Sequence, residues 1–214
     1  MAPVARLNRT HLLSALAFGL SLVLLPLTVL LPLTGCGVGD PAPPSAGDAV
    51  TLRGMVHGGQ APVDGAVMQL YAVGTGGNGT GATALITSKV VKTVNGAFAI
   101  SGDYTCASPV GGISPPVYLT ATGGNPGLAP GTNNAALALV VALGPCNTLY
   151  ANAATPTINI NEATTAAAAW ALAPFATLST SYSSSASSST NLAGITQAFV
   201  IANQLVGFSA AIPS

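Results

Sequence analysis

Residues 52–73 read LRGMVHGGQAPVDGAVMQLYAV, and this stretch decides the predicted fold. Residues 49–57 alternate partly between apolar and polar residues, and 58–62 contain two glycines and a proline, which indicates a turn. Residues 66–73 alternate well, and one side of this segment carries Val67, Gln69, Tyr71 and Val73. A period of two residues is typical of a strand with one buried face. The stretch therefore predicts two strands joined by a tight turn.

Further strands are predicted downstream of this pair. Residues 83–93 and 117–121 are rich in residues that favour strands. Asn95-Gly96 indicates a hairpin, because both central residues of a type I′ turn need a positive φ, and 97–100 supplies the returning strand. Five short strands with turn signals at this spacing predict a mainly β fold, an antiparallel β-sandwich.

The end of the predicted sandwich contains one ambiguous segment. Residues 135–143 are continuously apolar, so periodicity leaves strand and helix open. The short length and the flanking Gly and Pro favour a strand. Residues 157–160 alternate like a last strand, and we expect the β-sandwich domain to span 49–160.

One or two short helices are predicted after the sandwich. Asn161 has the chemistry of an N-cap, and Glu162 would lie at the positive end of the helix dipole, so an Ala-rich helix is predicted over 161–175. Trp170 is expected to anchor this helix to the sandwich, because a large ring contributes most of its energy when buried.

The C-terminal part divides into two predicted segments. The Ser/Thr-rich tract 176–192 predicts a flexible linker. Residues 193–207 carry apolar residues at helical spacing and predict an amphipathic helix. Such a helix docks back on the domain, binds a partner, or is the start of a longer protein cut short.

The sandwich sequence resembles the carboxypeptidase-regulatory-like, or transthyretin-like (prealbumin-like), domain. That family has a G-x-V strand, a turn followed by P-V-x-G-A-x-V-x-L, and later a turn followed by G-x-F. The matching residues are Gly54, Val56, Pro62, Val63, Gly65, Ala66, Val67, Leu70, Gly96 and Phe98. The match covers roughly residues 49–122, while Met55 and the Gly-rich insertion after Val73 depart from it. The resemblance implies a Greek-key sandwich of a type often grouped with carbohydrate-binding-like folds. No sugar-binding motif comes with it.

The N-terminal region has the pattern of a bacterial export signal. Residues 1–11 are basic, 12–35 are apolar, and Leu33-Thr34-Gly35-Cys36 resembles the bacterial lipobox. The resemblance implies a cleaved lipoprotein signal peptide over 1–35, lipid such as palmitate on Cys36, and a location in the cell envelope. The alternative is an uncleaved membrane anchor, which the two prolines in the second half of the run disfavour.

The lipobox has consequences for the residues that follow it. Residues 36–48 are rich in Gly and Pro and predict a flexible tether. Gly37, where an aspartate commonly favours retention in the inner membrane, points to the outer membrane or the cell surface. Because Cys36 is assigned to lipid, Cys106 and Cys146 remain as a pair that an exported compartment allows to oxidise. Two free buried thiols are the alternative.

Charge excludes one large class of partner. Aspartate, glutamate, lysine and arginine make up only 5% of the chain, and from Cys36 onward three bases and five acids give a net charge of −2. A basic patch that could hold phosphates is missing, so nucleic acid is not an expected partner. Residues 74–79 satisfy G-x-G-x-x-G, but strand-like sequence follows where a nucleotide-binding loop needs a helix. We therefore predict a hairpin loop and no nucleotide.

Candidate catalytic residues are few. His57 is the only histidine after residue 35, and a triad would pair it with Asp64 or Asp103 and a serine. Asp64 in its Pro-Val-Asp-Gly turn is better explained by backbone hydrogen bonds, and Glu162 by the helix start. The scattered acids have no metal-ligand spacing, so neither a metal nor a cofactor is expected.

Three tyrosines are candidate binding residues. Tyr71, Tyr104 and Tyr118 could stack on sugar rings if their faces are exposed, and packing in the core is the alternative. The sequence as a whole predicts a non-catalytic, lipid-anchored envelope protein whose sandwich is a structural or binding module. Its expected partners are the bilayer, through Cys36, and a glycan or an envelope protein. A small envelope hydrolase, or an accessory domain of one, is the alternative.

Overall fold

A computed structural model describes residues 51–76, 80–102, 104–151, 157–178, 181–182 and 189–207 of the chain. All of these residues belong to the unit Asp40–Ser214. The predicted signal peptide 1–35 and tether 36–48 lie outside the described residues. Within the described ranges, every helix is too short or too polar to cross a bilayer.

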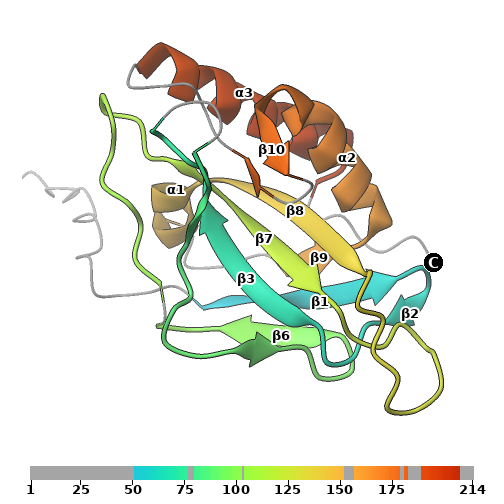
Figure 1. Cartoon of the computed structure of the whole chain (residues 1–214). Coiled ribbons are helices and arrows are strands. Elements are labelled where there is room, and N and C mark those ends of the chain that lie inside the picture. The colour runs from blue at the N-terminus through green and yellow to red at the C-terminus, as the bar shows by residue number, and fades with distance from the viewer. Residues whose placement is uncertain are drawn as a thin grey trace, which may run out of the picture. The chain divides into compact units, whose positions relative to one another are not determined.

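The first sheet is built around β1 (Leu52–Gly58) (Figure 1). β1 pairs antiparallel with β2 (Ala61–Pro62) and β6 (Ala97–Ile100), and parallel with β9 (Ile158–Ile160). β1 is the strand predicted over 49–57, and the predicted turn leads into the short β2; the strand predicted over 66–73 lies in the other sheet. Alternate residues of β1 and β6 are buried, as a half-exposed sheet requires.

Gly54 is the residue at which three strands of this sheet meet. It lies opposite Phe98 of β6 on one side and Ile158 of β9 on the other. A Cβ at this position would overlap the carbonyl oxygen of Ile158 and approach the Phe98 ring to 2.7 Å. Only glycine therefore fits between the two neighbouring strands.

The second sheet is built around β3 (Val67–Ala72). β3 pairs antiparallel with β7 (Pro116–Thr122), which pairs in turn with β8 (Ala138–Pro145). On its other side β3 pairs with β4 (Thr83–Ala84) and β5 (Val91–Lys92). Two sheets of mostly antiparallel strands, with a few short helices, confirm the predicted mainly β sandwich.

The edge of the second sheet differs from the single strand predicted over 83–93. Between β4 and β5 the side chain of Gln69 takes over the pairing. Its Nε2 donates to the Ile86 carbonyl at 3.0 Å, and its Oε1 accepts from the Ile86 N–H at 3.1 Å. An amide side chain presents the same donor and acceptor as a peptide group, so one glutamine replaces a rung of the ladder.

The turn predicted at Asn95-Gly96 is confirmed, but β6 after the turn pairs with β1 rather than with the strand before the turn. Asn95 has φ 49° and Gly96 has φ 78°, and Val94 pairs with Ala97 across the turn. The Gly96 carbonyl accepts from the Val56 N–H at 2.8 Å, so the turn also pairs with β1. The hairpin thus carries the chain from the edge of the second sheet into the first.

A hydrophobic core fills the space between the two sheets. Leu52, Val56, Leu70, Ile100, Val117, Leu119 and Ile160 are completely buried there. Each such side chain contributes roughly 1.5–3 kcal/mol by leaving water. This set is the first hydrophobic cluster.

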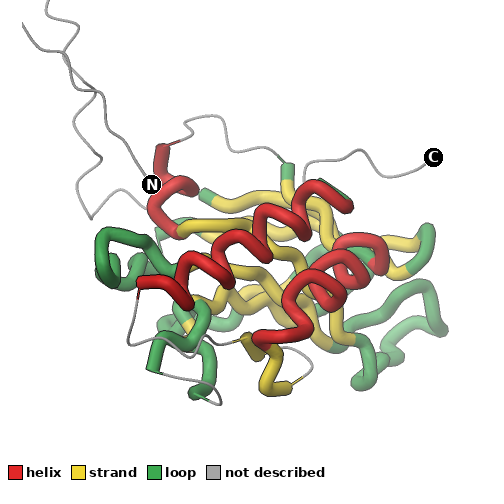
Figure 2. The backbone as a smooth tube through the Cα atoms, turned by 90° about the horizontal axis from the view of Figure 1, so that it is seen from above, coloured by secondary structure: helices red, strands yellow, loops and turns green. Residues whose placement is uncertain are grey.

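Two helices form a third layer, on the outer face of the second sheet. α2 (Glu162–Leu172) and α3 (Ser189–Leu205) pack on β8 and on each other, and Figure 2 shows both lying across the strands. The side chains buried beneath them form a second hydrophobic cluster that includes Tyr118, Val140, Leu172, Tyr182 and Phe199.

The third layer explains the ambiguous apolar segment. β8 is a strand, as its length and flanking residues favour, and it is buried on both faces. β7 is likewise buried on both faces along almost its whole length. A strand covered on both sides has no polar face and no alternation, which is why periodicity left strand and helix open.

α2 begins as the sequence predicts. Asn161 Oδ1 accepts from the Thr164 N–H at 3.0 Å, and Thr164 Oγ1 accepts from the Asn161 N–H at 3.0 Å. This is a reciprocal capping box. Pro174 lies in the 3₁₀ turn η1 (Ala173–Phe175) that follows α2.

The segment predicted as a linker, 176–192, contains regular structure where it is described. β10 (Ala176–Leu178) pairs with β11 (Ser181–Tyr182), and α3 begins at Ser189. Tyr182 is buried in the second cluster at 1% exposure. The serine-rich composition alone predicts a solvated chain. Tyr182 instead packs in the second cluster and holds part of this segment against the domain.

Candidate functional site

The lipidation residue Cys36 lies outside the described residues. The other two cysteines form a disulfide, with their Cα atoms 5.7 Å apart. The structure thus pairs Cys106 with Cys146, which is the pairing expected if Cys36 is reserved for another use.

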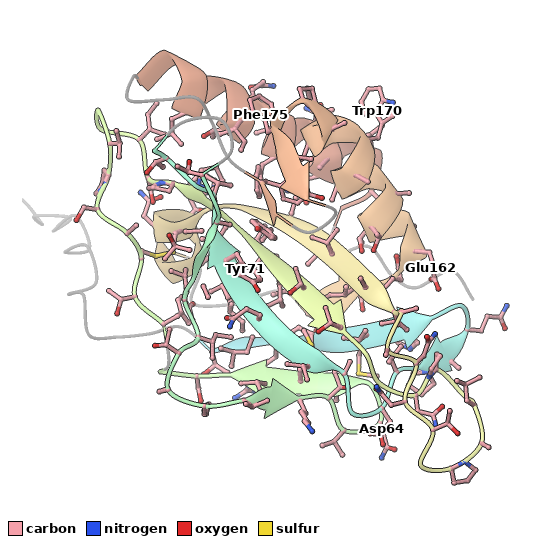
Figure 3. All side chains as sticks on the ribbon, viewed as in Figure 1. Asp64, Tyr71, Glu162, Trp170 and Phe175 are labelled. Atoms are coloured by element: carbon pink, nitrogen blue, oxygen red, sulfur yellow. A yellow bond between two sulfur atoms is a disulfide. The ribbon has the colours of Figure 1, made fainter. Side chains whose placement is uncertain are left out.

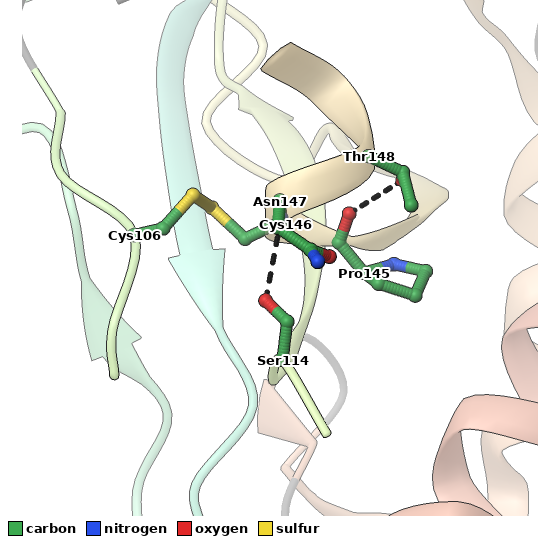
Figure 4. The surroundings of a disulfide bond; sticks show 6 residues. All are labelled: Cys106, Ser114, Pro145, Cys146, Asn147 and Thr148. Atoms are coloured by element: carbon green, nitrogen blue, oxygen red, sulfur yellow. Dashed lines mark hydrogen bonds between the residues drawn. A yellow bond between two sulfur atoms is a disulfide. The ribbon is translucent and has the colours of Figure 1, made fainter. Parts of the chain in front are cut away.

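The disulfide fastens the long loop before β7 to the end of β8 (Figure 4). Cys146 is the first residue of α1 (Cys146–Ala151), a helix the sequence did not predict. Its N–H donates to the Pro115 carbonyl at 3.2 Å, and the Asn147 N–H donates to Ser114 Oγ at 3.3 Å. One covalent bond and two hydrogen bonds therefore hold the loop against α1.

Tyr118 lies at the centre of the second cluster and is fully buried. Its ring stacks on Tyr71, with centroids 5.4 Å apart and planes at 18°, and meets Tyr182 edge-on at 5.0 Å. The Tyr182 N–H donates to the Tyr118 hydroxyl at 3.4 Å. Burial raises the pKa of the Tyr182 phenol. These rings hold the helical layer on the sheet.

The positions of Tyr104 and Tyr118 argue against sugar stacking by these two candidate residues. Tyr104 is 5% exposed within the first cluster, and Tyr118 is fully buried in the second. Neither offers a ring face to a solvent-borne sugar. Tyr71 is half-buried, with one face against Tyr118. Packing was the competing explanation, and packing in the two clusters is what the structure has for Tyr104 and Tyr118.

The candidate catalytic residues hold structural contacts. Asp64 Oδ1 accepts from the Asn95 N–H at 2.8 Å and steadies the hairpin turn. Glu162 Oε1 accepts from the Gly59 N–H at 2.6 Å and ties α2 to the β1–β2 turn. His57 is half-buried, and its Nδ1 is buried without a hydrogen-bond partner. A triad histidine needs a carboxylate on one ring nitrogen, and Nδ1 has none; Asp103 lies outside the described residues.

Two other sequence motifs can be placed. The described parts of the 74–79 loop connect β3 with β4, two antiparallel strands, rather than a strand with a helix. A phosphate site of the G-x-G-x-x-G kind depends on the helix N-terminus, so this loop is a hairpin connection. Among the residues that the structure describes, no three His, Cys, Asp or Glu side chains gather as a metal site would require.

Trp170 lies on the outer side of α2 and is 69% exposed. The expectation that it anchors the helix is wrong, because α2 packs through its small residues instead. Its buried side chains are Thr164, Ala167, Ala168, Ala171 and Leu172. In Figure 3 the Trp170 ring points away from the strands.

The exposed side chains of α2 after Glu162 and those of α3 form one surface, which we call the helical surface. Its large apolar members are Trp170, Val200 and Leu205, at 69, 41 and 52% exposure. Its other exposed members are mostly alanine and glutamine. From residue 163 to 207 the sequence contains no charged residue.

The charged side chains lie elsewhere on the domain. Arg53 is on β1, Lys92 is on β5 and Lys89 is close to it in sequence, while Asp64 supports the hairpin turn. The fifth described charge, Glu162, is the first residue of α2 and bonds to the β1–β2 turn. Figure 3 places Asp64 on the opposite side of the domain from Trp170. The helical surface therefore carries no charge, whereas the strands and their loops carry both charged side chains and exposed Val67, Val90, Val94 and Leu128.

Sequence reasoning missed the helical surface although part of the signal was present. Buried positions in α2 recur at 164, 167, 168, 171 and 172, which is helical spacing, and Trp170 falls off that stripe. Alanine fills both faces, however, so the helix shows little contrast between an apolar and a polar side. The comparison of the whole chain with protein-family models, curated proteins and solved structures found no significant match.

Proposed function

We propose that this protein is a non-catalytic lipoprotein of the cell envelope, held at a bilayer through acylated Cys36. The observation that carries the proposal is the sequence Leu33-Thr34-Gly35-Cys36 at the end of a basic-then-apolar N-terminal region. The Cys106–Cys146 disulfide supports it, because such bonds persist in exported compartments. Gly37 favours sorting to the outer membrane or the cell surface.

The domain behind the tether is a prealbumin-like Greek-key sandwich that acts as a structural or binding module. Two glycines of the family pattern support this finer assignment. Gly54 fits where two neighbouring strands leave no room for a side chain, and Gly96 forms the turn between the sheets.

The structural roles of the acidic residues favour a module over a hydrolase. Asp64 and Glu162 each accept a backbone N–H from a distant turn, so their carboxylates stabilise the sandwich and its junction with α2. A triad histidine would instead need a carboxylate on a ring nitrogen, and His57 Nδ1 is buried without a hydrogen-bond partner. Replacing His57 by Ala should therefore leave any screened hydrolytic activity of a preparation unchanged, and a loss of activity at unchanged stability would overturn this part.

Mass spectrometry of the protein extracted from membranes tests the anchor. The expected mass is that of a chain beginning at Cys36 with two or three acyl chains, since one chain alone binds only marginally. The matched variant Cys36→Ser should lose both the acyl mass and the membrane association. A chain that keeps residues 1–35 and carries no acyl group would overturn the proposal.

A further inference from the structure

The helical surface exposes three large apolar side chains, Trp170, Val200 and Leu205, of a kind that proteins usually bury. Trp170 is the only tryptophan in the chain, and it makes no contribution to the second cluster beneath it. Val200 and Leu205 of α3 add further exposed apolar area to the same layer. Single exposed apolar residues such as Val90, which lies between Lys89 and Lys92 in the sequence, need no explanation. A large exposed ring in a stretch of 45 residues without a charge, 163–207, is more typical of a contact site.

The chemistry of this surface fits the interfacial region of a phospholipid bilayer. Tryptophan has an apolar ring and one N–H donor, and it concentrates where acyl chains meet headgroups. A charged side chain pressed into that region would carry a desolvation cost, and the sequence has none between 163 and 207. Arg53, Lys89 and Lys92, on or near strands, would stay in water.

The proposed anchor holds the domain near the bilayer, so a small surface is sufficient for the domain to contact it. Fourteen residues, 37–50, separate Cys36 from the first described residue. Fully extended they would span about 50 Å at about 3.5 Å per residue, so any side of the domain can turn towards the bilayer and none can move far from it. Tethering raises the effective concentration of the bilayer at the domain. A second protein copy would need roughly 800 Å² of complementary surface on each partner.

We propose that the helical surface lies on the bilayer to which Cys36 is anchored, with Trp170 in the interfacial region. The inference rests on the proposed lipid anchor and adds an orientation to it. The first sheet and the hairpin at Asn95-Gly96 then face away from the bilayer, and a partner would meet the protein on that side.

Fluorescence of the single tryptophan tests this orientation directly. The mature protein, extracted from membranes, is reconstituted into phosphatidylethanolamine and phosphatidylglycerol vesicles. Some vesicles contain a phosphatidylcholine that is brominated near the headgroup end of one acyl chain. We expect the Trp170 emission to shift to shorter wavelength on reconstitution and to lose most of its intensity in the brominated vesicles.

A matched variant moves the tryptophan to the far edge of the second sheet. Val90 is 71% exposed and lies next to β5, the edge opposite β8. The double variant Trp170→Phe/Val90→Trp should float with the vesicles and show no quenching. Equal or stronger quenching at position 90 would overturn the proposal in favour of contact through the basic side chains.

Two further outcomes would also overturn it. Lack of quenching at either position, in protein that floats with the vesicles, would show a domain that stands away from the bilayer. A blue shift of Trp170 that grows with protein concentration and ignores the bromines would assign the surface to a second copy. Failure of the anchor itself is distinguishable, because the unvaried protein would then neither float with the vesicles nor carry an acyl mass.

Discussion

The two hydrophobic clusters of this protein share one sheet but are built from different side chains. The first, between the sheets, consists mainly of branched aliphatic residues with Phe98. The second, under the helices, combines tyrosine rings with alanines and Phe199. β7 serves both, since Leu119 faces the first cluster and Tyr118 the second. A sandwich can thus gain a third layer by changing only the outward residues of its central strands.

The two regions also differ in what they leave on the surface. Described charges lie on or near the strands or at the junction with α2, whereas the helices expose alanine, glutamine and Trp170. The sandwich side exposes apolar residues such as Val90 and Val94 among its charges, whereas the helical side exposes apolar residues without any charge after Glu162. Substitutions that destabilise one region at a time show whether the stability of the other region depends on it.

The largest effect is expected from Phe199→Ala in the second cluster. Phe199 is fully buried, and truncating such a ring should destabilise the protein by roughly 3–5 kcal/mol. The neighbouring variant Val200→Ala, at an exposed position, should cost less than about 0.5 kcal/mol. Urea unfolding followed by Trp170 fluorescence and by far-UV circular dichroism measures both. Because β7 belongs to both clusters, the two probes should report one transition; separate transitions would show that the layers unfold independently.

The disulfide is the next largest contribution, and it acts on the sandwich side. It closes a loop with a sequence separation of 40, so its removal should cost about 3–4 kcal/mol through the entropy of the unfolded chain. The double variant Cys106→Ser/Cys146→Ser and the reduced wild-type protein should share one lowered urea midpoint. A midpoint equal to that of the oxidised wild type would contradict the assigned role.

Gly54→Ala should break the first sheet from within. The new Cβ would overlap the Ile158 carbonyl, which belongs to the paired backbone and cannot move without separating β1 from β9. A cost of about 3 kcal/mol is expected, at the upper end for overpacking. The control Gly81→Ala meets no atom within 4 Å and should stay within about 0.5 kcal/mol of wild type. Similar melting temperatures for the two variants would contradict the conclusion that only glycine fits at position 54.

Much of the sandwich could be predicted from the sequence, because alternation and turn chemistry are local signals. The hairpin at Asn95-Gly96 and the capping box at Asn161 each depend on neighbouring residues alone. The edge at Gln69 could not be predicted, since a side chain there replaces a backbone rung 17 residues away. Trp170 could not be placed because alanines blur the two faces of α2. The burial of Tyr118 depends on helices that the strand sequence does not reveal.

Thr165 tests the junction between the two regions. Its hydroxyl donates to the Asn161 carbonyl at 2.7 Å and accepts from the Val140 N–H of β8 at 3.0 Å. Thr165→Val keeps the shape but leaves that strand donor unpaired, which should cost about 1–2 kcal/mol. The control Thr196→Val, whose hydroxyl donates to Leu192 within α3, should cost less than about 0.5 kcal/mol. Faster hydrogen exchange at the Val140 amide in Thr165→Val is the specific sign. Unchanged exchange would show that the Thr165 hydroxyl does not protect this strand amide.

The smallest effect expected near neutral pH concerns Tyr182, and it appears only in alkali. Burial raises its pKa in the folded protein, while an unfolded tyrosine titrates near about 10. Above that pH the unfolded chain has lost a proton that the folded chain keeps, so stability falls as pH rises, by at most about 1.4 kcal/mol per pH unit. The stability difference between wild type and Tyr182→Phe should therefore be constant from neutral pH until tyrosine begins to ionise. It should then move in favour of the variant. Urea midpoints across this range measure it, and a difference that stays constant into strong alkali would mean that the second cluster admits water around the phenol.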